Sequence, residues 1–515
     1  MKFVLIAVLA LAVLASAAPV AAEDLGKKRS LLWEPVEWSK SGISYNGNPI
    51  DIISTVVFTH TWSGRTIKTE MYSDGTDKWK LRFTGTLVGR WLFKTQSDMP
   101  ALNDLTGEVR VGPNPGKAGF MTNYGGKWGR LGVDEAFVPQ FVMYDDPFEI
   151  MQHPKQIDED IRVFFAEHGF NGFHTSVSCR WFDITQPASD KINSTDPNPD
   201  PRTFEMLELL ITKTRNAGGV VHIWAWGDDQ RKMTVVRWGI NGKVDKRLQR
   251  YICARLGPLP GWSMGYGFDL QEWVKKEDMA AWHKYMQEHL GWFHFLGARA
   301  PELETIYSGL DYSSYQKWRP DYDTYVQAIE KLSPGKPVFF EDRFRVRKDV
   351  YPEKDYSLEM TRKGLWHSTM AGGAANIWGY WLTDTGRGAS GPYPNKDQIL
   401  TYSKFFRNRF RKEMVRDNSV TDGVCLTITA RKKTKAGGET TAPLVNTHYV
   451  FYKENASSVK TDMSGMGERR PGIVIDTNKP YQEINMGLLD PVDQTWQAPY
   501  ESDWAIAVGD FGSRK

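Results

Sequence analysis

Strand-like and helix-like segments alternate along about 270 residues that begin near position 134, and this alternation restricts the fold more than any other feature. Short apolar runs such as Gly219–Trp226 come before longer segments in which apolar residues recur at helical spacing. In Phe204–Asn216, for example, Leu207 and Ile211 fall on one side of a helix. Repeated strand–helix units build a parallel sheet, so we predict a (β/α)8 barrel over residues 134–412.

Seven strands of this barrel have a clear apolar pattern. They are expected at residues 137–143, 170–177, 219–226, 262–266, 303–308, 337–341 and 374–381. The helices are expected at residues 153–168, 204–216, 246–256, 278–296, 322–332, 357–371 and 399–410. The remaining strand is predicted near residues 310–315, where the apolar pattern is weak.

The segments on both sides of the predicted barrel contain short strands. Trp79, Leu81 and Phe83 alternate with charged residues, and this period of two is typical of a half-buried strand. Regularly spaced short strands are typical of an antiparallel sandwich. We therefore predict one β-sandwich at residues 31–125 and a second at residues 420–515.

The first 22 residues have the composition of a secretory signal peptide. Lys2 precedes an apolar run, and Val20 and Ala22 occupy the two positions that a signal peptidase reads before Glu23. We expect export to the periplasm or the outside and removal of residues 1–22. A membrane anchor is the alternative, but the apolar core is short for a spanning helix, and no later stretch is long enough to span.

Charge and cysteine content exclude several functional classes. The net charge is +3, from 65 basic and 62 acidic residues, and lacks the basic excess of a nucleic-acid binder. The 3 cysteines are odd in number and widely spaced, which does not indicate a disulfide framework. Cys-x-x-Cys and His-x-x-x-His patterns are missing from the sequence, so we predict no zinc site and no cofactor, while structural calcium and the oligomeric state stay open.

Glu341 is the candidate ionised catalytic residue. Active residues of such barrels lie at the C-terminal ends of the strands, and Glu341 directly ends an apolar strand. Arg343 and Arg345 are close enough in sequence to hold it charged, either for catalysis or in an ordinary salt bridge. Cleavage of a glycosidic bond needs such an ionised carboxylate together with a protonated one. Asp342 is expected to point the opposite way if the strand continues, in a structural role.

Two carboxylates after the strand at residues 262–266 compete for the role of the acid. Gly265 and Gly267 let the backbone turn tightly and would leave Asp269 at the barrel mouth. Glu272 is the rival, and its alternative role is that of a carboxylate at a helix start.

Aromatic residues are abundant, at 13% of the chain with 20 Trp. Flat aromatic rings stack on the C–H faces of sugars, but they also fill protein cores. The candidate sugar-binding residues at strand ends are His174, Trp224, Trp226, Arg343, Trp378 and Trp381. Core packing is the alternative for His174 and the tryptophans, and a solvated basic loop is the alternative for Arg343.

Several segments resemble those of secreted bacterial glycoside hydrolases. Thr69–Phe93 resembles a domain of unknown function that precedes barrels in such enzymes. The segments WSMGYGFDLQEW, PVFFEDRF and GGAANIWGYW resemble strands four, seven and eight of barrel glycosidases of the cellulase-like clan, near its apiosidase-like branch. YVFYKENASSVKTDMSGM and APYESDWAIAV are similar to a C-terminal, collagen-binding-like sandwich. The resemblance extends over nearly the whole chain after the signal peptide.

The resemblance implies a retaining hydrolase whose nucleophile lies at strand seven and whose acid/base follows strand four. Carried over to this sequence, it makes Glu341 the nucleophile and Asp269 the acid/base, and Trp378 matches the aromatic residue of strand eight. The Asn-Glu pair that is common after strand four is absent, and Tyr266 and Gly267 stand near its place.

The sequence therefore predicts a secreted glycoside hydrolase that acts on a polysaccharide or oligosaccharide by retaining double displacement. Two other classes stay open. One is a carbohydrate-binding or surface protein that has lost catalysis. The other is a polysaccharide lyase that uses His174 or a tyrosine as its base.

Overall fold

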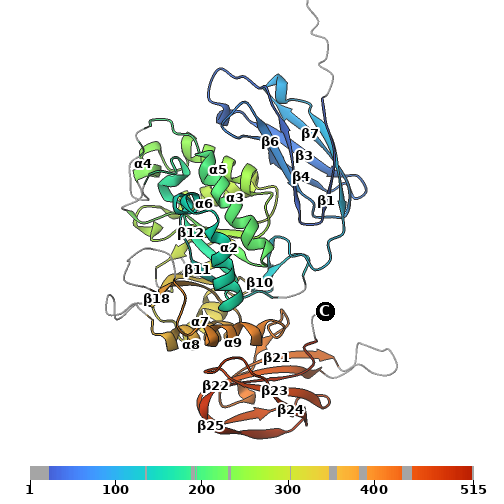
Figure 1. Cartoon of the computed structure of the whole chain (residues 1–515), viewed down its shortest axis with the longest axis vertical. Helices are drawn as coiled ribbons and strands as arrows, with labels where there is room; N and C mark the ends of the chain where they lie inside the picture. The colour runs from blue at the N-terminus through green and yellow to red at the C-terminus, as the bar shows by residue number, and fades with distance from the viewer. Residues whose placement is uncertain are drawn as a thin grey trace, which may run out of the picture.

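Three parts follow one another along the long axis of the molecule in the computed structural model: an N-terminal β domain, a central α/β barrel and a C-terminal β domain (Figure 1). The structure describes residues 23–133, 136–186, 192, 194–229, 233–301, 303–304, 306–346, 356–381, 391–431 and 444–512. The predicted signal peptide lies outside these residues. None of the described helices is long and apolar enough to cross a membrane.

The central part is the predicted (β/α)8 barrel. Its described strands form one parallel sheet in the order β15-β14-β13-β12-β11-β19-β18-β17-β16. They are β11 (Gln140–Met143), β12 (Gly172–Ser176), β13 (Val220–Trp226), β14 (Trp262–Gly267), β15 (Leu296–Gly297), β16 (Arg299–Ala300), β17 (Ser313–Tyr315), β18 (Val338–Val346) and β19 (Ala375–Trp381). Only Ala298 separates the two end strands, β15 and β16, so together they form the fifth of eight barrel strands and close the sheet.

Helices cover the outside of the barrel. They are α1 (Pro147–Gln152), α2 (Gln156–Ile161), α3 (Pro201–Asn216), α4 (Met233–Trp238), α5 (Lys243–Leu256), α6 (Lys276–His289), α7 (Tyr322–Gln327), α8 (Leu358–Met370) and α9 (Lys396–Phe406). Helix α3 shows why such segments begin where they do. Pro201 supplies a preset backbone angle in its first turn, and the Asp200 carboxylate accepts a hydrogen bond from the Arg202 amide.

Strand five lies earlier in the chain than the sequence predicts. The predicted strand at residues 303–308 is wrong, and the predicted helix at residues 278–296 ends at His289. The real strand, Leu296–Ala300, contains glycine, alanine and arginine and therefore has no apolar pattern. Its glycine is required, because a Cβ on Gly297 would lie 2.2 Å from the ring of Tyr312. The predicted strand near residues 310–315 is confirmed as β17.

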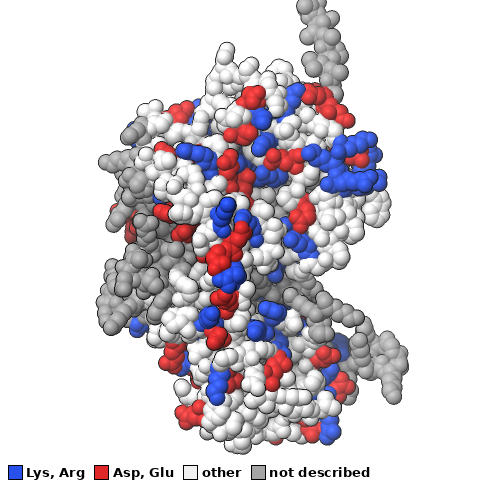
Figure 2. Space-filling view, in the orientation of Figure 1, with Lys and Arg blue, Asp and Glu red and all other residues white. Residues whose placement is uncertain are grey.

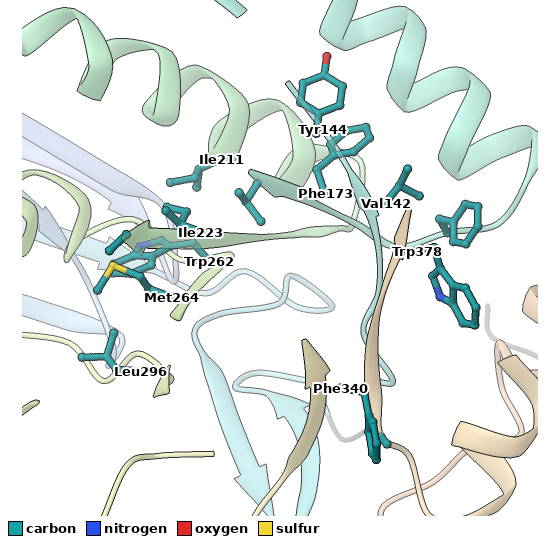
Figure 3. Close-up of a cluster of buried hydrophobic side chains, with 14 of the residues drawn as sticks. Val142, Tyr144, Phe173, Ile211, Ile223, Trp262, Met264, Leu296, Phe340 and Trp378 are labelled. Atoms are coloured by element: carbon teal, nitrogen blue, oxygen red, sulfur yellow. The ribbon is translucent and has the colours of Figure 1, made fainter. Parts of the chain in front are cut away.

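Alternation along the strands separates an outer core layer from an inner one. Val142, Ile223 and Phe340 point outward and pack beneath the helices (Figure 3). The inner layer includes Phe141, Val220, Trp224, Phe295, Tyr312, Phe339 and Ile377. The Pro- and Gly-rich stretch before the barrel forms a hairpin of β9 (Met121–Tyr124) and β10 (Lys127–Arg130). Trp128 of this hairpin packs against the inner layer, and its Nε1 donates to the Val338 carbonyl at 2.8 Å.

The N-terminal domain consists of two packed sheets. One has the strand order β1-β8-β7-β3-β4 and the other β2-β6-β5. The strands are β1 (Asp24–Leu31), β2 (Pro35–Lys40), β3 (Ser54–His60), β4 (Thr66–Glu70), β5 (Tyr72–Ser73), β6 (Trp79–Thr84), β7 (Gly89–Ser97) and β8 (Thr106–Gly112). Large aromatic residues, among them Phe58, Phe83 and Trp91, fill the space between the sheets. The sandwich is not wholly antiparallel, because β1 pairs with β8 in parallel.

The C-terminal domain is a six-stranded antiparallel sheet in the order β20-β21-β22-β25-β23-β24. The strands are β20 (Val415–Arg416), β21 (Val424–Arg431), β22 (Leu444–Asp462), β23 (Arg470–Asp476), β24 (Ile484–Leu489) and β25 (Asp493–Val508). One face has its own core, which includes Phe451 and Trp504. The other face packs on the barrel, where Tyr452 stacks on Trp366 of α8 with 4.9 Å between ring centroids.

Candidate active site

Glu341 lies in an irregular part of β18, near the C-terminal end of the barrel. Phe340 pairs with Asn376 of β19, and the next paired residue of β18 is Arg343, which pairs with Ile377. The pairing of β18 with β19 therefore skips Glu341 and its neighbour Asp342, as in a β-bulge. The Glu341 side chain points toward the barrel axis and has no exposed surface.

Two aromatic donors hold the Glu341 carboxylate. The indole Nε1 of Trp224 donates to Oε2 at 2.6 Å, and the Tyr312 hydroxyl donates to Oε1 at 2.5 Å. Gly265 of β14 provides the space, because a Cβ there would lie 2.8 Å from Oε2. This carboxylate is thus built into the inner layer by residues from three other parts of the barrel.

Burial raises the pKa of Glu341 above its ordinary value of 4.5. Hydrogen bonds from Tyr312 and Trp224 and the positive charge of Arg299 act in the opposite direction, because they stabilise the ionised form. The sequence suggested Arg343 and Arg345 for this electrostatic role. The structure places another cation, Arg299 of strand five, near Glu341, and the Arg343 side chain lies outside the described residues.

A line of hydrogen bonds extends from Glu341 to two buried histidines. His222 Nε2 lies 3.1 Å from the Tyr312 oxygen, and His222 Nδ1 lies 2.9 Å from Nδ1 of His174. Because Tyr312 donates its proton to Glu341, it accepts from His222 Nε2–H, and His222 Nδ1 accepts from His174. Burial lowers the pKa of His222 well below 6.5, which agrees with this neutral tautomer.

Arg299 connects the acidic residues around the site. Its guanidinium donates to the Asp269 carboxylate and, at 3.1 Å, to the backbone carbonyl of Glu341. A third group, the Asp342 carboxylate, lies 3.8 Å from the same guanidinium. The sequence analysis expected Asp342 to point opposite Glu341 if the strand continued regularly; both residues lie in the bulge, so regular alternation does not set the direction of Asp342. Arg299 itself is only 3% exposed.

Asp269 and Glu272, the two predicted acids, have different surroundings. Asp269 follows β14 in a left-handed conformation, with φ of 54°, and contacts Arg299. Glu272 is exposed, and its carboxylate accepts a hydrogen bond from the backbone amide of Asp229 at 2.9 Å. Glu272 therefore stabilises a neighbouring loop, whereas Asp269 shares an arginine with the Glu341 backbone.

The described side chains among the predicted sugar-binding residues are buried and do not form one exposed surface. Trp224 and His174 belong to the buried hydrogen-bonded network around Glu341, and Trp226 is 4% exposed. Trp378 is contrary to expectation: it lies in the outer core layer (Figure 3), where its Nε1 donates to Gln140 at 2.7 Å. Because Ile377 faces inward, the next residue must face the helices. The side chains of Arg343 and Trp381 lie outside the described residues.

Sequence reasoning missed Arg299 and Tyr312. Arg299 lies in a strand without an apolar pattern, and Tyr312 directly precedes the weakly patterned β17. No local signal identifies Tyr312 as a neighbour of Glu341. An arginine within an otherwise small and apolar segment, Leu296–Ala300, was the available hint.

Comparisons with known proteins agree with this architecture. Residues 31–98 match the family described as a domain of unknown function (DUF5060). No curated protein sequence matches the chain. A solved structure of a candidate glycoside hydrolase from Bacteroides vulgatus ATCC 8482 is 14% identical, with a TM-score of 0.69, and the match covers 94% of this chain and 99% of that chain.

A glycoside hydrolase family 5 structure from the same organism is 12% identical, with a TM-score of 0.55, and that match covers 77% of this chain and 95% of the other. A third structure, described as a glycoside hydrolase, is 11% identical with a TM-score of 0.54, covering 76% of this chain and 97% of the other. Similarity at these identities demonstrates a shared fold. This chain has a (β/α)8 barrel with flanking β-sandwich domains, and its fold is shared with these structures.

Proposed function

We propose that this chain is a glycoside hydrolase that cleaves O-glycosidic bonds in a polysaccharide or oligosaccharide. The observation that carries the proposal is the Glu341 carboxylate, held toward the barrel axis by Trp224 and Tyr312 next to the Arg299–Asp269 pair. Export through the signal peptide and membership of the cellulase-like clan, near its apiosidase-like branch, belong to the same proposal.

The proposed reaction is a retaining double displacement. The ionised Glu341 attacks the anomeric carbon while the bond to the leaving oxygen breaks, and Asp269 gives that oxygen a proton. Water then attacks the glycosyl ester, Asp269 takes its proton, and Glu341 leaves as a carboxylate. Asp269 can act in this way only if its ion pair with Arg299 opens, and a sugar can reach the unexposed Glu341 only if neighbouring side chains move.

The direct test is a screen of the purified protein against plant and marine polysaccharides, with analysis of the products. We expect new reducing ends on at least one of them, and NMR of the first product should show the anomeric configuration of the substrate. An inverted first product would contradict double displacement. Unsaturated uronides, detected by ultraviolet absorbance, would instead identify a lyase.

The Asp269→Asn variant tests whether Asp269, rather than a neighbouring carboxylate, is the acid/base. We expect turnover on the natural glycan to fall by about 10²–10⁴-fold, because general acid catalysis contributes that much. Aryl glycosides with good leaving groups should lose far less in the first step, since they need little protonation. Asp342→Asn and Glu272→Gln serve as matched controls, and a larger loss in either variant would move the acid role to that residue.

Tyr312→Phe should shift the pH dependence. The Tyr312 hydrogen bond stabilises ionised Glu341, so its removal raises the pKa of Glu341 further. Because the nucleophile must be ionised, the low-pH limb of kcat/KM should move to higher pH by about one unit. Tyr315→Phe is the control, since Tyr315 bonds Ser333 in the outer layer. Equal pH profiles for both variants would contradict the role of Tyr312.

A second candidate function is carbohydrate binding without catalysis. The observation in its favour is that β14 presents Gly265, rather than a carboxylate, beside Glu341. Complete absence of cleavage in the screen, together with glycan binding at the barrel, would support this alternative.

A further inference from the structure

Three arginines lie side by side on the open face of the N-terminal sandwich. Arg29 of β1 pairs in register with Arg110 of β8, and Arg110 pairs with Arg90 of β7. Paired residues on adjacent strands point to the same side of the sheet, and all three side chains belong to exposed residues. Like charges directly opposite one another destabilise a sheet, so this row is unfavourable in the absence of an anion.

The row has little compensation within the described residues. Glu108 pairs with Arg90 at 2.7 Å and also attracts Arg110 and Lys27 through its charge, whereas no direct ion pair or side-chain hydrogen bond in the described part of the chain involves Arg29 or Arg110. The same face also carries exposed Lys27, Lys68 and Lys94, of which Lys94 pairs with Asp104. Figure 2 shows Lys and Arg gathered at the right-hand edge of this domain, the side on which β1 lies.

An almost fully exposed tryptophan stands at the end of this row. Trp62 is 91% exposed, at the tip of the loop between β3 and β4. The preceding residue, Thr61, donates its backbone amide to the Arg90 carbonyl at 2.9 Å, which positions the loop beside the arginines. Leaving a whole indole ring in contact with water is unfavourable, because its apolar surface is not buried. An exposed flat ring of this kind can stack on the face of a sugar.

The same face of the sheet is hollowed beside Arg90. A depression of about 550 Å³ is lined by Val57, Thr59, Leu92, Lys94 and Glu108, together with neighbouring residues. It joins apolar surface, hydroxyl groups and the cations Lys27, Arg90 and Lys94 on one sheet, together with the carboxylates of Asp24 and Glu108. Sugars with acidic substituents have matching C–H faces, hydroxyls and negative charge.

We infer that this face of the N-terminal domain binds an anionic polysaccharide, whose sulfate or carboxylate groups contact the Arg29–Arg110–Arg90 row and one of whose rings stacks on Trp62. Nucleic acid is the less suitable polyanion, because the whole chain carries only +3 and lacks a general basic excess. The site is separate from the barrel and would hold the chain on its polymer whether or not the barrel cleaves it.

Affinity electrophoresis of the full chain tests this inference. The gels contain polygalacturonate, dextran sulfate or neutral dextran, and single-stranded DNA is measured by mobility shift. We expect retardation by at least one anionic polysaccharide and none by neutral dextran. Arg29→Ser/Arg110→Ser should weaken that binding at least about 10-fold, because the contacts with the sulfate or carboxylate groups are lost. Trp62→Ala should weaken it at least about 5-fold, because ring stacking is lost.

The matched control is Lys460→Ser/Arg469→Ser, which removes the same charge from the C-terminal domain and should stay within about two-fold of wild type. Three results would overturn the inference. They are an equal loss of polysaccharide binding in this control, no binding to either anionic polysaccharide, and equally strong DNA binding that Trp62→Ala does not weaken. The Glu341→Gln variant should still bind, so failure of this site and failure of the hydrolase proposal are distinguishable.

Discussion

Glu341→Gln is expected to lower turnover on the cleaved glycan by about 10³-fold or more, because an amide cannot attack the anomeric carbon as a carboxylate does. The change keeps the size of the side chain. The glutamine NH2 group, however, would face the hydrogen-bond donors of Trp224 and Tyr312, and two donors cannot bond each other. Folding of the variant must therefore be checked in parallel by thermal unfolding. Initial rates of reducing-end release measure the effect.

Glu341→Ala with azide gives an independent measurement. Azide can take the place of the missing carboxylate, and a retaining enzyme then restores turnover on an activated glycoside and forms a glycosyl azide of inverted configuration. Glu288→Gln, an exposed helix position, is the control for charge alone. Wild-type turnover in Glu341→Gln would show that Glu341 is not the nucleophile.

Arg362→Met is expected to give the largest loss of stability. Arg362 of α8 forms an ion pair with Asp503 of β25 at 2.6 Å, and both side chains are 2% exposed. Removal of the arginine leaves a buried, unpaired carboxylate, which costs about 3–5 kcal/mol. The pair joins the barrel to the C-terminal domain, so calorimetry of the full chain should show the melting transition of that domain at lower temperature.

A double variant distinguishes the pair from the packing around it. Arg362→Met/Asp503→Asn leaves no charge buried and should be more stable than Arg362→Met alone. Arg409→Met, at the same interface, breaks a more exposed pair with Glu483 and should cost about 1 kcal/mol or less. Equal losses in Arg362→Met and Arg409→Met would contradict the argument.

The sequence pattern was informative where strands are apolar and long. Strands β13 and β19 were predicted within one residue at both ends, and β18 within one residue at its start, because burial on both faces requires continuous apolar runs. Glu341 could be selected for a similar reason, since an acidic residue directly after such a run needs an explanation. Strand five was missed because a short strand of small residues and one arginine has no such pattern.

The sequence by itself determined the order of strands and helices, and hence the barrel, because hydrophobic periodicity is a local property of the chain. Tertiary structure alone decided which side chains meet at Glu341. Trp224 lies 117 residues away in the chain, and barrel closure brings Arg299 of strand five beside it. The tertiary structure also decided that Trp378 faces the helices and that Asp342 approaches Arg299. Alternation along a strand sets only the relative directions of successive side chains, whereas strand pairing and the bulge set the absolute direction of each one.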